Sequence, residues 1–435
     1  MVFGIELILI GDQLATISGS KNAFLSVSSV LSVANKMLSV EEALDLVAKH
    51  CSPLAPRRVP LGEAAGLVLA EDIASDVDSP PHDKAMMDGY AVRSIDRQPE
   101  RQILEEIAAG SVPHFSLKPG TASHIMTGAP LPDGADAVVP VEQTELVSAS
   151  TVRLQQVAPA RGQHVLPLGA SMRAGDVVVR SGAVLRPIEI AILAETGHSS
   201  VLVIPRPRLA ILPTGNELVA VREKPGPGQI RNSNGLMLVA AGTRAEADAT
   251  ELGVARDTHD DLTQSIQQGL AADVFVLCGG VSAGKFDLVP RVLAELGVEQ
   301  VFHKIALRPG KPLWFGIKKA GERNVLVFGL PGNPVSSLVC FELFARPAIA
   351  ALAGRGFAQR SSVRAKLNHA YDHAGHRAAY LPARLDDRGS EKSVVILPWQ
   401  GSADLATLAQ ANGLARLPIE KRRFEPGDML DVLLI

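Results

Sequence analysis

Three basic side chains lie close together in the second half of the chain: Lys304, Arg308 and Lys311. If the residues around them form one strand, Lys304 and Arg308 share a face and are roughly 13 Å apart at the usual rise per residue. A Pro-Gly turn then brings Lys311 to the same edge. Three fixed cations along one edge suit a long ligand with several negative charges better than a single small anion. The stretch therefore predicts a binding site for such a ligand.

A second candidate anion site follows directly. The apolar run 324–329 predicts a buried strand, Pro331-Gly-Asn-Pro334 ends it sharply, and residues 335–352 have the pattern of a helix. A strand, a tight turn and a helix N-terminus leave backbone N–H groups where an anion can sit. An ordinary strand-to-helix loop with basic neighbours explains the same pattern, and the sequence leaves both interpretations open.

Four carboxylates could take part in chemistry. Glu217, Asp257 and Asp287 lie in loops around the predicted strands of the second half, and Asp88 lies in an earlier Gly- and Pro-rich module. Mg²⁺ prefers oxygen ligands and usually takes one or two carboxylates together with substrate phosphate. Glu217 and Asp287 are well placed for that role. The alternatives are structural, because Asp287 could cap the next helix, Asp257 could belong to a loop, and Asp88 could form a turn.

Composition and missing motifs exclude several classes of function. Gly279 and Gly280 follow a predicted strand, as in a phosphate-binding loop, but the chain has neither a Gly-x-Gly-x-x-Gly fingerprint nor a P-loop. The net charge of -3 and the aromatic content of 4% argue against a nucleic-acid partner. No apolar run is long enough to span a membrane, and three widely separated cysteines fit a cytoplasmic protein.

The chain is predicted to combine one α/β domain with several β-rich modules. The strands 209–212, 274–277 and 325–328 are rich in Val, Leu and Ile without alternation, which is typical of strands buried on both faces. With helices between them they predict a doubly wound α/β domain, whose ligand edge lies at the carboxyl ends of the strands. Short strands elsewhere predict β-rich modules. The last of them, with strands expected at 362–367, 394–397 and 429–434, is predicted to be a compact β-barrel or sandwich. The expected helices span 39–50, with Ser39 as its N-cap, 187–196, 234–241, 261–271 and 287–296.

Seven short motifs occur in order, and as a set they are far more specific than any one of them. They are Ala85-Met-Met-Asp-Gly-Tyr-Ala91, Ile125-Met-Thr-Gly-Ala-Pro130, Pro213-Thr-Gly-Asn-Glu-Leu218, Gly279-Gly-Val-Ser282, Lys304-Ile-Ala-Leu-Arg-Pro-Gly-Lys-Pro312, Leu330-Pro-Gly-Asn-Pro-Val-Ser336 and Gln400-Gly-Ser402. From about residue 37 to the C-terminus, the chain resembles the molybdopterin molybdenumtransferase family, which includes MoeA and the E domain of gephyrin.

The resemblance implies an elongated homodimer whose site is shared between subunits. It implies that adenylylated molybdopterin is hydrolysed with Mg²⁺ and that molybdate is inserted at the dithiolene, with release of AMP. A molybdopterin adenylyltransferase and molybdoenzymes are the expected protein contacts. The implied parts are a leader at 1–36, expected to be disordered, an N-terminal domain at 37–78 and 160–204, a small β-rich domain at 79–159, the α/β domain at 205–353 and the barrel at 354–435.

The resemblance also assigns roles by position. Lys304, Arg308 and Lys311 would hold phosphate or molybdate, and Asp88 with Thr127 would be contributed by the second subunit. The acids expected to be catalytic are Asp88, Glu217, Asp257 and Asp287, of which the last three would also hold the metal. The expected substrate-binding residues are Thr127, Thr214, Gly279, Gly280, Ser282, Lys304, Arg308, Lys311, Pro331, Asn333, Pro334, Ser336, Arg377 and Ser402.

One loop departs from the family pattern. Residues 166–171 read Leu-Pro-Leu-Gly-Ala-Ser, where the family usually has arginines and acids. Loss of the acid at Ser171 would suit a non-catalytic paralogue that binds molybdopterin or the finished cofactor as a carrier or scaffold. Retention of Asp257, Asp287, Lys304 and Lys311 favours the enzyme. The transferase is therefore the leading hypothesis and the binding protein the alternative.

Overall fold

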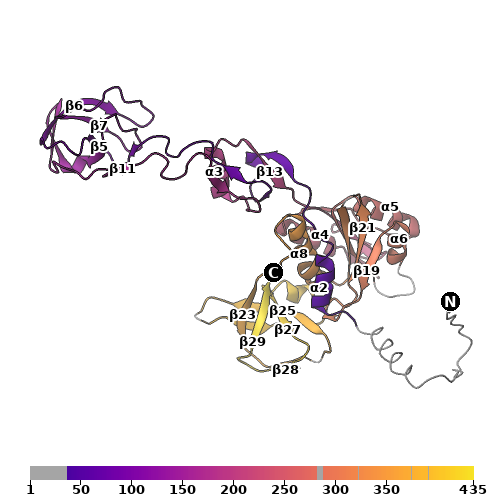
Figure 1. Ribbon diagram of the computed structural model, residues 1–435. Coiled ribbons are helices and arrows are strands. Elements are labelled where there is room, and N and C mark those ends of the chain that lie inside the picture. The colour runs from indigo at the N-terminus through magenta and orange to yellow at the C-terminus, as the bar shows by residue number, and fades with distance from the viewer. Residues whose placement is uncertain (1–36, 282–287, 322, 374, 390) are drawn as a thin grey trace, which may run out of the picture.

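The computed structural model describes residues 37–281, 288–321, 323–373, 375–389 and 391–435, and its shape is elongated (Figure 1). A small β-rich unit lies at one end. A slender arm joins it to an α/β domain and a β-barrel at the other end. This arrangement confirms the predicted fold class.

The arm is built from two stretches that are far apart in the chain. Its antiparallel sheet has the order β1-β13-β2, and β3 pairs with β12. Strands that precede the small unit in the chain therefore pair with strands that follow it. Helix α3 begins at Pro187, as predicted, and buries Leu193 in the apolar core of the arm. The elements are β1 (Arg57–Pro60), β2 (Val68–Leu69), β3 (Ile73–Ala74), β12 (Val177–Val179), α3 (Pro187–Glu195) and β13 (Ser200–Ile204).

The small unit contains a six-stranded sheet of order β8-β5-β7-β6-β10-β9. Strand β5 is buried on both faces, because Ala91 enters one apolar cluster while Tyr90 and Val92 enter another. Strands β4 and β11 pair with each other beside this sheet. The strands are β4 (Lys84–Ala85), β5 (Gly89–Val92), β6 (Glu100–Ile107), β7 (Thr121–Ile125), β8 (Ala137–Pro140), β9 (Thr144–Ser148), β10 (Thr151–Leu154) and β11 (Val165–Leu166).

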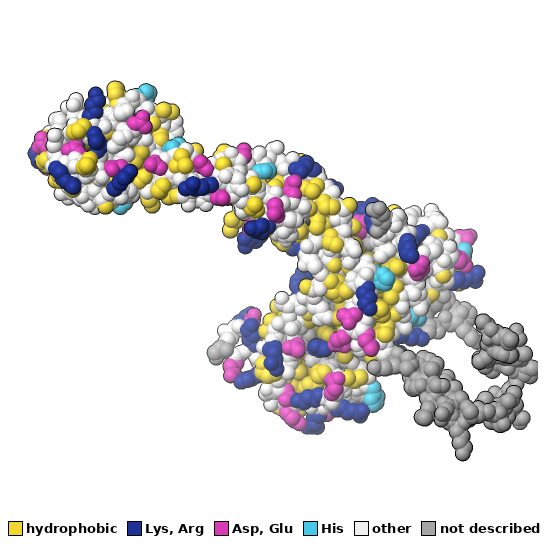
Figure 2. All heavy atoms as spheres, viewed as in Figure 1, with side chains coloured by type: hydrophobic (Ala, Val, Ile, Leu, Met, Phe, Trp, Pro, Cys, Tyr) yellow, Lys and Arg dark blue, Asp and Glu magenta, His cyan; other side chains and the backbone are white. Residues whose placement is uncertain are grey.

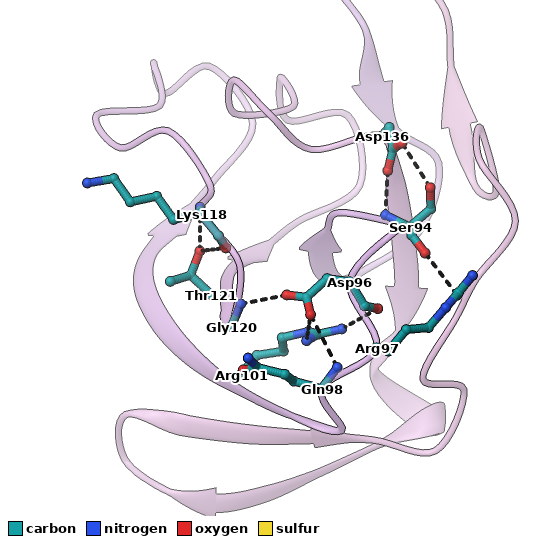
Figure 3. Close-up of polar contacts among 9 residues, drawn as sticks. All are labelled: Ser94, Asp96, Arg97, Gln98, Arg101, Lys118, Gly120, Thr121 and Asp136. Atoms are coloured by element: carbon teal, nitrogen blue, oxygen red, sulfur yellow. Dashed lines mark hydrogen bonds and ion pairs between the residues drawn. The ribbon is translucent and has the colours of Figure 1, made fainter.

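A buried ion pair holds the loops of the small unit together (Figure 3). Nη1 of Arg101 lies 2.8 Å from Oδ1 of Asp96, and Nη2 donates to the backbone oxygen of Asp96 at 2.9 Å. Burial alone would raise the pKa of Asp96, but hydrogen bonds from the backbone N–H groups of Gly120 and Gln98 and the charge of Arg101 outweigh it and lower the pKa. The carboxylate therefore stays ionised and ties its loop to the turn at Gly120.

The α/β domain is built on a six-stranded sheet of order β17-β14-β18-β22-β21-β19. The first four strands run parallel to one another, β21 runs antiparallel to them, and β19 pairs antiparallel with β21 and so runs in the same direction as the first four. Helices α4, α7 and α8 contribute to an apolar cluster on one face, and α5 and α6 to a cluster on the other. The elements are β14 (Arg208–Pro213), β15 (Leu218–Val219), β16 (Ile230–Arg231), α4 (Asn234–Arg244), β17 (Asp248–Glu251), α5 (His259–Gly269), β18 (Val274–Cys278), α6 (Val289–Glu295), β19 (Glu299–His303), β21 (Trp314–Ala320), β22 (Arg323–Leu330), α7 (Pro334–Cys340) and α8 (Arg346–Leu352).

Helix α2 (Val40–Ala48) packs on this domain rather than on the arm. The predicted cap is confirmed, because the Ser39 hydroxyl accepts from the backbone N–H of Glu42, whose carboxylate in turn accepts from the backbone N–H of Ser39. The apolar face of α2, which includes Val40 and Leu44, enters the core of the α/β domain. The first part of the 37–78 segment is thus held by the α/β domain.

The C-terminal unit is a closed β-barrel. Its sheet runs β25-β26-β23-β29-β27, and β27 pairs back onto β25, so the ring has no free edge. Strands 362–367 and 429–434 form where they were predicted. The elements are β23 (Ser362–Leu367), β24 (Tyr371–Asp372), β25 (Ala378–Asp386), β26 (Ser393–Ile396), α9 (Leu405–Leu408), β27 (Gly413–Leu417), β28 (Arg423–Phe424) and β29 (Met429–Leu434).

The stretch with three cations is not one strand. Strand β19 ends before Lys304, which has a positive φ of 70°, and β20 (Leu307–Arg308) pairs with β25 of the barrel instead. Between them, the backbone N–H of Ala306 donates to the carbonyl of Leu38 at 2.8 Å. Long-range pairing therefore bends the chain here. The interpretation that Lys304 and Arg308 share one face of a strand is wrong, because the chain passes from one sheet into another between them.

Within the described residues, one helical stretch, Pro334–Leu352, is long and apolar enough to span a membrane, and 83% of it is buried inside the protein. It comprises α7, a π-helical turn at Phe341–Ala345, and α8. Such burial is typical of a core helix. On the face shown in Figure 2, acidic and basic side chains are interspersed over all units.

We predict that replacing Arg101 with methionine destabilises the small unit by about 3–5 kcal/mol, because it leaves the buried Asp96 carboxylate without its ionic partner. Urea unfolding followed by a probe in this unit measures the change. Arg153, which forms exposed ion pairs with Glu100 and Glu145, is the matched control. Arg153→Met should cost less than about 1 kcal/mol. Equal effects of the two substitutions would contradict the prediction.

Candidate functional site

One cleft lies at the carboxyl ends of the parallel strands, where the sequence placed the ligand edge. Its volume is about 830 Å³. Loops after β14, β18 and β22 converge on it. The predicted residues that line it are Thr214, Glu217, Asp257, Gly279, Gly280, Pro331, Asn333 and Pro334. Ser282 and Asp287, which were also predicted, lie outside the described residues.

The glycine pair after β18 shapes the floor of this larger cleft. Gly279 and Gly280 have φ angles of 104° and 63°. A Cβ atom at Gly279 would lie 2.6 Å from the carbonyl oxygen of Thr214, and one at Gly280 would lie 2.8 Å from Cγ2 of Val289. Only glycine lets the backbone approach these neighbours so closely. The two glycines therefore let the loop pack closely against its neighbours and leave space for a ligand in the cleft.

Two carboxylates mark the acidic edge of the larger cleft. The backbone N–H of Asn216 donates to Asp257 at 3.3 Å, and the side-chain oxygen of Asn216 accepts from the backbone N–H of Asp257 at 3.2 Å. Nη1 of Arg256 braces the same loop by donating to the carbonyls of Asn216 and Leu218. Glu217 follows Asn216 in the chain, so the two carboxylates lie on two loops that these hydrogen bonds join at the edge of the cleft.

This donor set fits Mg²⁺, which usually takes one or two carboxylates from a protein and its other ligands from phosphate and water. Within the described ranges, no group of three or more His, Cys, Asp and Glu side chains could hold a metal ion by itself. The metal site of Glu217, Asp257 and Asp287 therefore stays a prediction.

A second cleft of about 530 Å³ lies between the α/β domain and the barrel. The predicted residues that line it are Arg308, Lys311, Pro331, Asn333, Ser336, Arg377 and Ser402. Lys304 is not among the residues that line either cleft. The bend at Lys304 accounts for this separation. Two of the three predicted cations thus come together, joined by the guanidinium of Arg377.

Contacts between domains build this basic cleft. Nδ2 of Asn333 donates to the hydroxyl of Ser402 at 2.7 Å, and the backbone N–H of Val335 donates to the carbonyl of Ser402 at 3.0 Å. Nη1 of Arg377 donates to the carbonyl of Leu307 at 3.1 Å. The start of α7 is therefore capped by the barrel, and the cleft exists only while the two domains are docked.

A buried histidine supports Arg377. Nε2 of His373 lies 2.9 Å from the carbonyl of Arg377, and only 1% of the residue is exposed. Burial lowers the pKa of His373, and the nearby charge of Arg308 lowers it further, against the opposing hydrogen bond to Arg377. The imidazole is thus held neutral beneath the basic cleft.

Sequence reasoning missed several residues that line the clefts. The larger cleft is also lined by a run from the end of β16 to the start of α4: Arg231, Asn232, Ser233 and Asn234. Trp399 and Gln400 reach the basic cleft. Two signals in the sequence could have located them. One is the polar run before the helix that was expected to begin at Asn234, and the other is the Gln400-Gly-Ser402 motif.

Asp88 and Thr127 lie far from both clefts of their own chain, in the small unit at the other end of the molecule (Figure 1). Oδ1 of Asp88 accepts two hydrogen bonds of 2.6 Å, from the hydroxyl and the backbone N–H of Thr127. Both bonds lower the pKa of Asp88, and the bond from the hydroxyl has the larger effect. The structure brings this pair together, but not with the other predicted residues.

Family models match nearly all of the described chain. The MoeA N-terminal region (domain I and II) matches residues 38–197, a probable molybdopterin binding domain matches 210–351, and the MoeA C-terminal region (domain IV) matches 364–435. The chain belongs to the MoeA family. The family predicted from the motifs is thereby confirmed.

Relatives and solved structures agree with membership of the MoeA family. A molybdopterin molybdenumtransferase of Staphylococcus aureus is 34% identical over 91% of this chain and 95% of its own. Molybdopterin molybdenumtransferase 1 of Mycobacterium tuberculosis is 35% identical over 92% and 99%. A molybdopterin biosynthesis MoeA protein from Pyrococcus horikoshii has a TM-score of 0.78 at 32% identity, covering 92% of this chain and 99% of that one. As a MoeA-family member, the chain is an enzyme of molybdenum cofactor biosynthesis.

We predict that Thr127→Val raises the pKa of Asp88 toward the ordinary value of an aspartate, because the hydroxyl donor is lost while the backbone donor remains. The carboxylate of the variant would therefore take up its proton at a higher pH. Carbon NMR titration of the Asp88 carboxyl measures the shift. Thr144→Val, which removes a hydroxyl bonded only to the Val141 carbonyl among the described contacts, should leave it unchanged. An unaltered titration in Thr127→Val would rule out the hydroxyl as the cause.

Proposed function

We propose that this chain catalyses the Mg²⁺-dependent insertion of molybdate into adenylylated molybdopterin, with release of AMP. The observation that carries the proposal is the pair of adjoining clefts. Pro312, Pro331 and Asn333 line both, so one bound molecule can extend from the acidic-edged cleft to the basic one. A nucleotide-linked pterin has the length and the two different ends that such a double site requires.

The larger cleft suits the phosphate-bearing part of this substrate. Gly279 and Gly280 open the loop after β18, and Thr214 lies directly beneath them. Glu217 and Asp257 would hold Mg²⁺, with phosphate oxygens among its other ligands. When bound, the metal would supply charge stabilisation at the phosphoanhydride that is hydrolysed. The chain's own groups bind the substrate and fix its orientation next to the basic cleft.

The basic cleft suits molybdate. Arg308, Lys311 and Arg377 supply positive charge, and the hydroxyls of Ser336 and Ser402 supply neutral donors. An oxyanion held there would lie beside the end of a pterin that reaches past Pro331. With molybdate and the pterin held side by side, their reaction would become effectively unimolecular.

We propose that a second copy of the chain completes the site. Asp88 and Thr127 lie at the far end of the subunit, so they can act on a cleft only if that cleft belongs to another subunit (Figure 1). A homodimer of elongated subunits would bring them there. The expected partners outside the dimer remain a molybdopterin adenylyltransferase and molybdoenzymes, in the cytoplasm.

The altered loop lies away from both clefts of its own chain. The backbone N–H of Ser171 donates to the carbonyl of Ser79 in the arm, and Ser171 lines a separate hollow with Glu195. Neither cleft of the same chain contains residues 166–171. The lost acid therefore leaves both clefts of its own subunit intact.

The test is AMP release from adenylylated molybdopterin, with and without Mg²⁺ and molybdate. Release that requires Mg²⁺ and is stimulated by molybdate, with molybdenum found on the pterin, is the expected result. Tight binding of the substrate without any AMP release would contradict the transferase and support the carrier.

We predict that Lys311→Ala raises the molybdate concentration needed for half-maximal insertion by about 10- to 150-fold, because one charge-assisted contact contributes roughly 1.5–3 kcal/mol. Molybdate titration of the insertion rate measures the change. Lys319, an exposed residue at the end of β21, is the matched control and its alanine variant should behave as wild type. An unchanged molybdate dependence in Lys311→Ala would remove this side chain from the oxyanion site.

A further inference from the structure

The larger cleft has an uneven balance of charge. Among the described residues that line it, Glu217 and Asp257 are acidic and Arg231 is the one basic residue. Arg308 and Lys311 line the neighbouring basic cleft instead. A phosphoanhydride in the larger cleft would therefore face two carboxylates, and among the described residues that line the cleft only Arg231 offers it a cationic side chain.

The backbone fixes Arg231 opposite the acidic loop. Strand β16 pairs in parallel with β15, with Val219 opposite Arg231. The backbone N–H of Ile230 donates to the carbonyl of Glu217 at 2.9 Å, so the residue next to Arg231 is bonded directly to one of the acids. Helix α4 starts at Asn234, three residues later, and its N-terminus adds positive potential on the same side.

The guanidinium is anchored by one nitrogen and available through the others. Nε of Arg231 donates to the carbonyl of Glu223 at 2.9 Å, which orients the planar group. The residue is exposed. A guanidinium has five N–H donors in a fixed fork, and its two terminal nitrogens match two oxygens of a phosphate. The side chain is thus oriented before any ligand arrives.

We propose that Arg231 binds the phosphate groups of the nucleotide part of the substrate in the larger cleft. It would offset the repulsion between these phosphates and the carboxylates of Glu217 and Asp257. This inference rests on the proposed function, because it takes the nucleotide-linked pterin as the ligand. It separates two anion sites, one for phosphate at Arg231 and one for the oxyanion at Arg308, Lys311 and Arg377.

A structural role is the competing explanation. The bond from Nε to the Glu223 carbonyl also braces the loop 220–229, so loss of Arg231 could disturb the cleft without any contact to phosphate. The two roles differ in what they do to a ligand without phosphate. A phosphate contact affects AMP and spares adenosine, whereas a disturbed cleft weakens both.

The experiment compares AMP and adenosine binding by calorimetry to the full chain and to three variants, Arg231→Ala, Arg231→Lys and Arg222→Ala. Arg222 is the matched control, because it is an exposed arginine of the same loop that does not line the larger cleft. We expect wild type to bind AMP more tightly than adenosine. Arg231→Ala should lose about tenfold or more in affinity for AMP and none for adenosine, as for one charge-assisted contact.

Arg231→Lys should keep part of the preference for AMP, since a lysine retains the charge but not the fork, and Arg222→Ala should match wild type. Three results would overturn the proposal: unchanged AMP affinity in Arg231→Ala, an equal loss for AMP and adenosine, or a wild-type protein that does not prefer AMP. The outcome of the transferase assay does not depend on the outcome of this binding experiment. A chain that binds AMP through Arg231 but releases none from the substrate would lose the proposed function and keep the phosphate site.

Discussion

The docking of the barrel on the α/β domain is the contact on which the rest of the site depends. Ser402 accepts one hydrogen bond from Asn333 and one from the backbone of Val335, and so caps a helix of another domain. The turn at Pro331 that this cap holds in place lines both clefts. If the barrel moved away, the basic cleft would lose one wall. The larger cleft would lose the fixed turn at Pro331 that separates it from the basic cleft.

Much of the fold follows from local sequence. Uninterrupted Val, Leu and Ile runs predicted the three central strands, and Ser39 predicted the start of the first described helix. These signals are local because parallel strands buried on both faces need no alternation and a capping box lies within four residues. The bend at Lys304 could not be predicted in this way. It depends on pairing with Leu38 and with the barrel, which are remote in the chain.

The candidate site was predictable to the extent that its residues belong to motifs. The glycine pair, the acids at Glu217 and Asp257 and the turn at Pro331 lie where the strand ends placed them. Arg231 and Trp399 were missed, because only the tertiary fold brings them to a cleft. The separation of Lys304 from Arg308 and Lys311 was also hidden, since in the sequence the three look like one group. Charge along a chain is a poor guide to charge around a cavity.

The pairing of distant segments also sets the order in which the chain can fold during synthesis. The small unit draws its sheet from residues 89–154 and can form early. The arm around it must wait, because β1 near residue 59 needs β13 near residue 201. Helix α2 waits longest, since the backbone N–H of Leu54 bonds to the carbonyl of Leu352 and the face of α2 needs the finished α/β core. The first described helix leaves the ribosome early and is buried only after about 300 further residues have emerged, so its apolar face stays uncovered during most of synthesis.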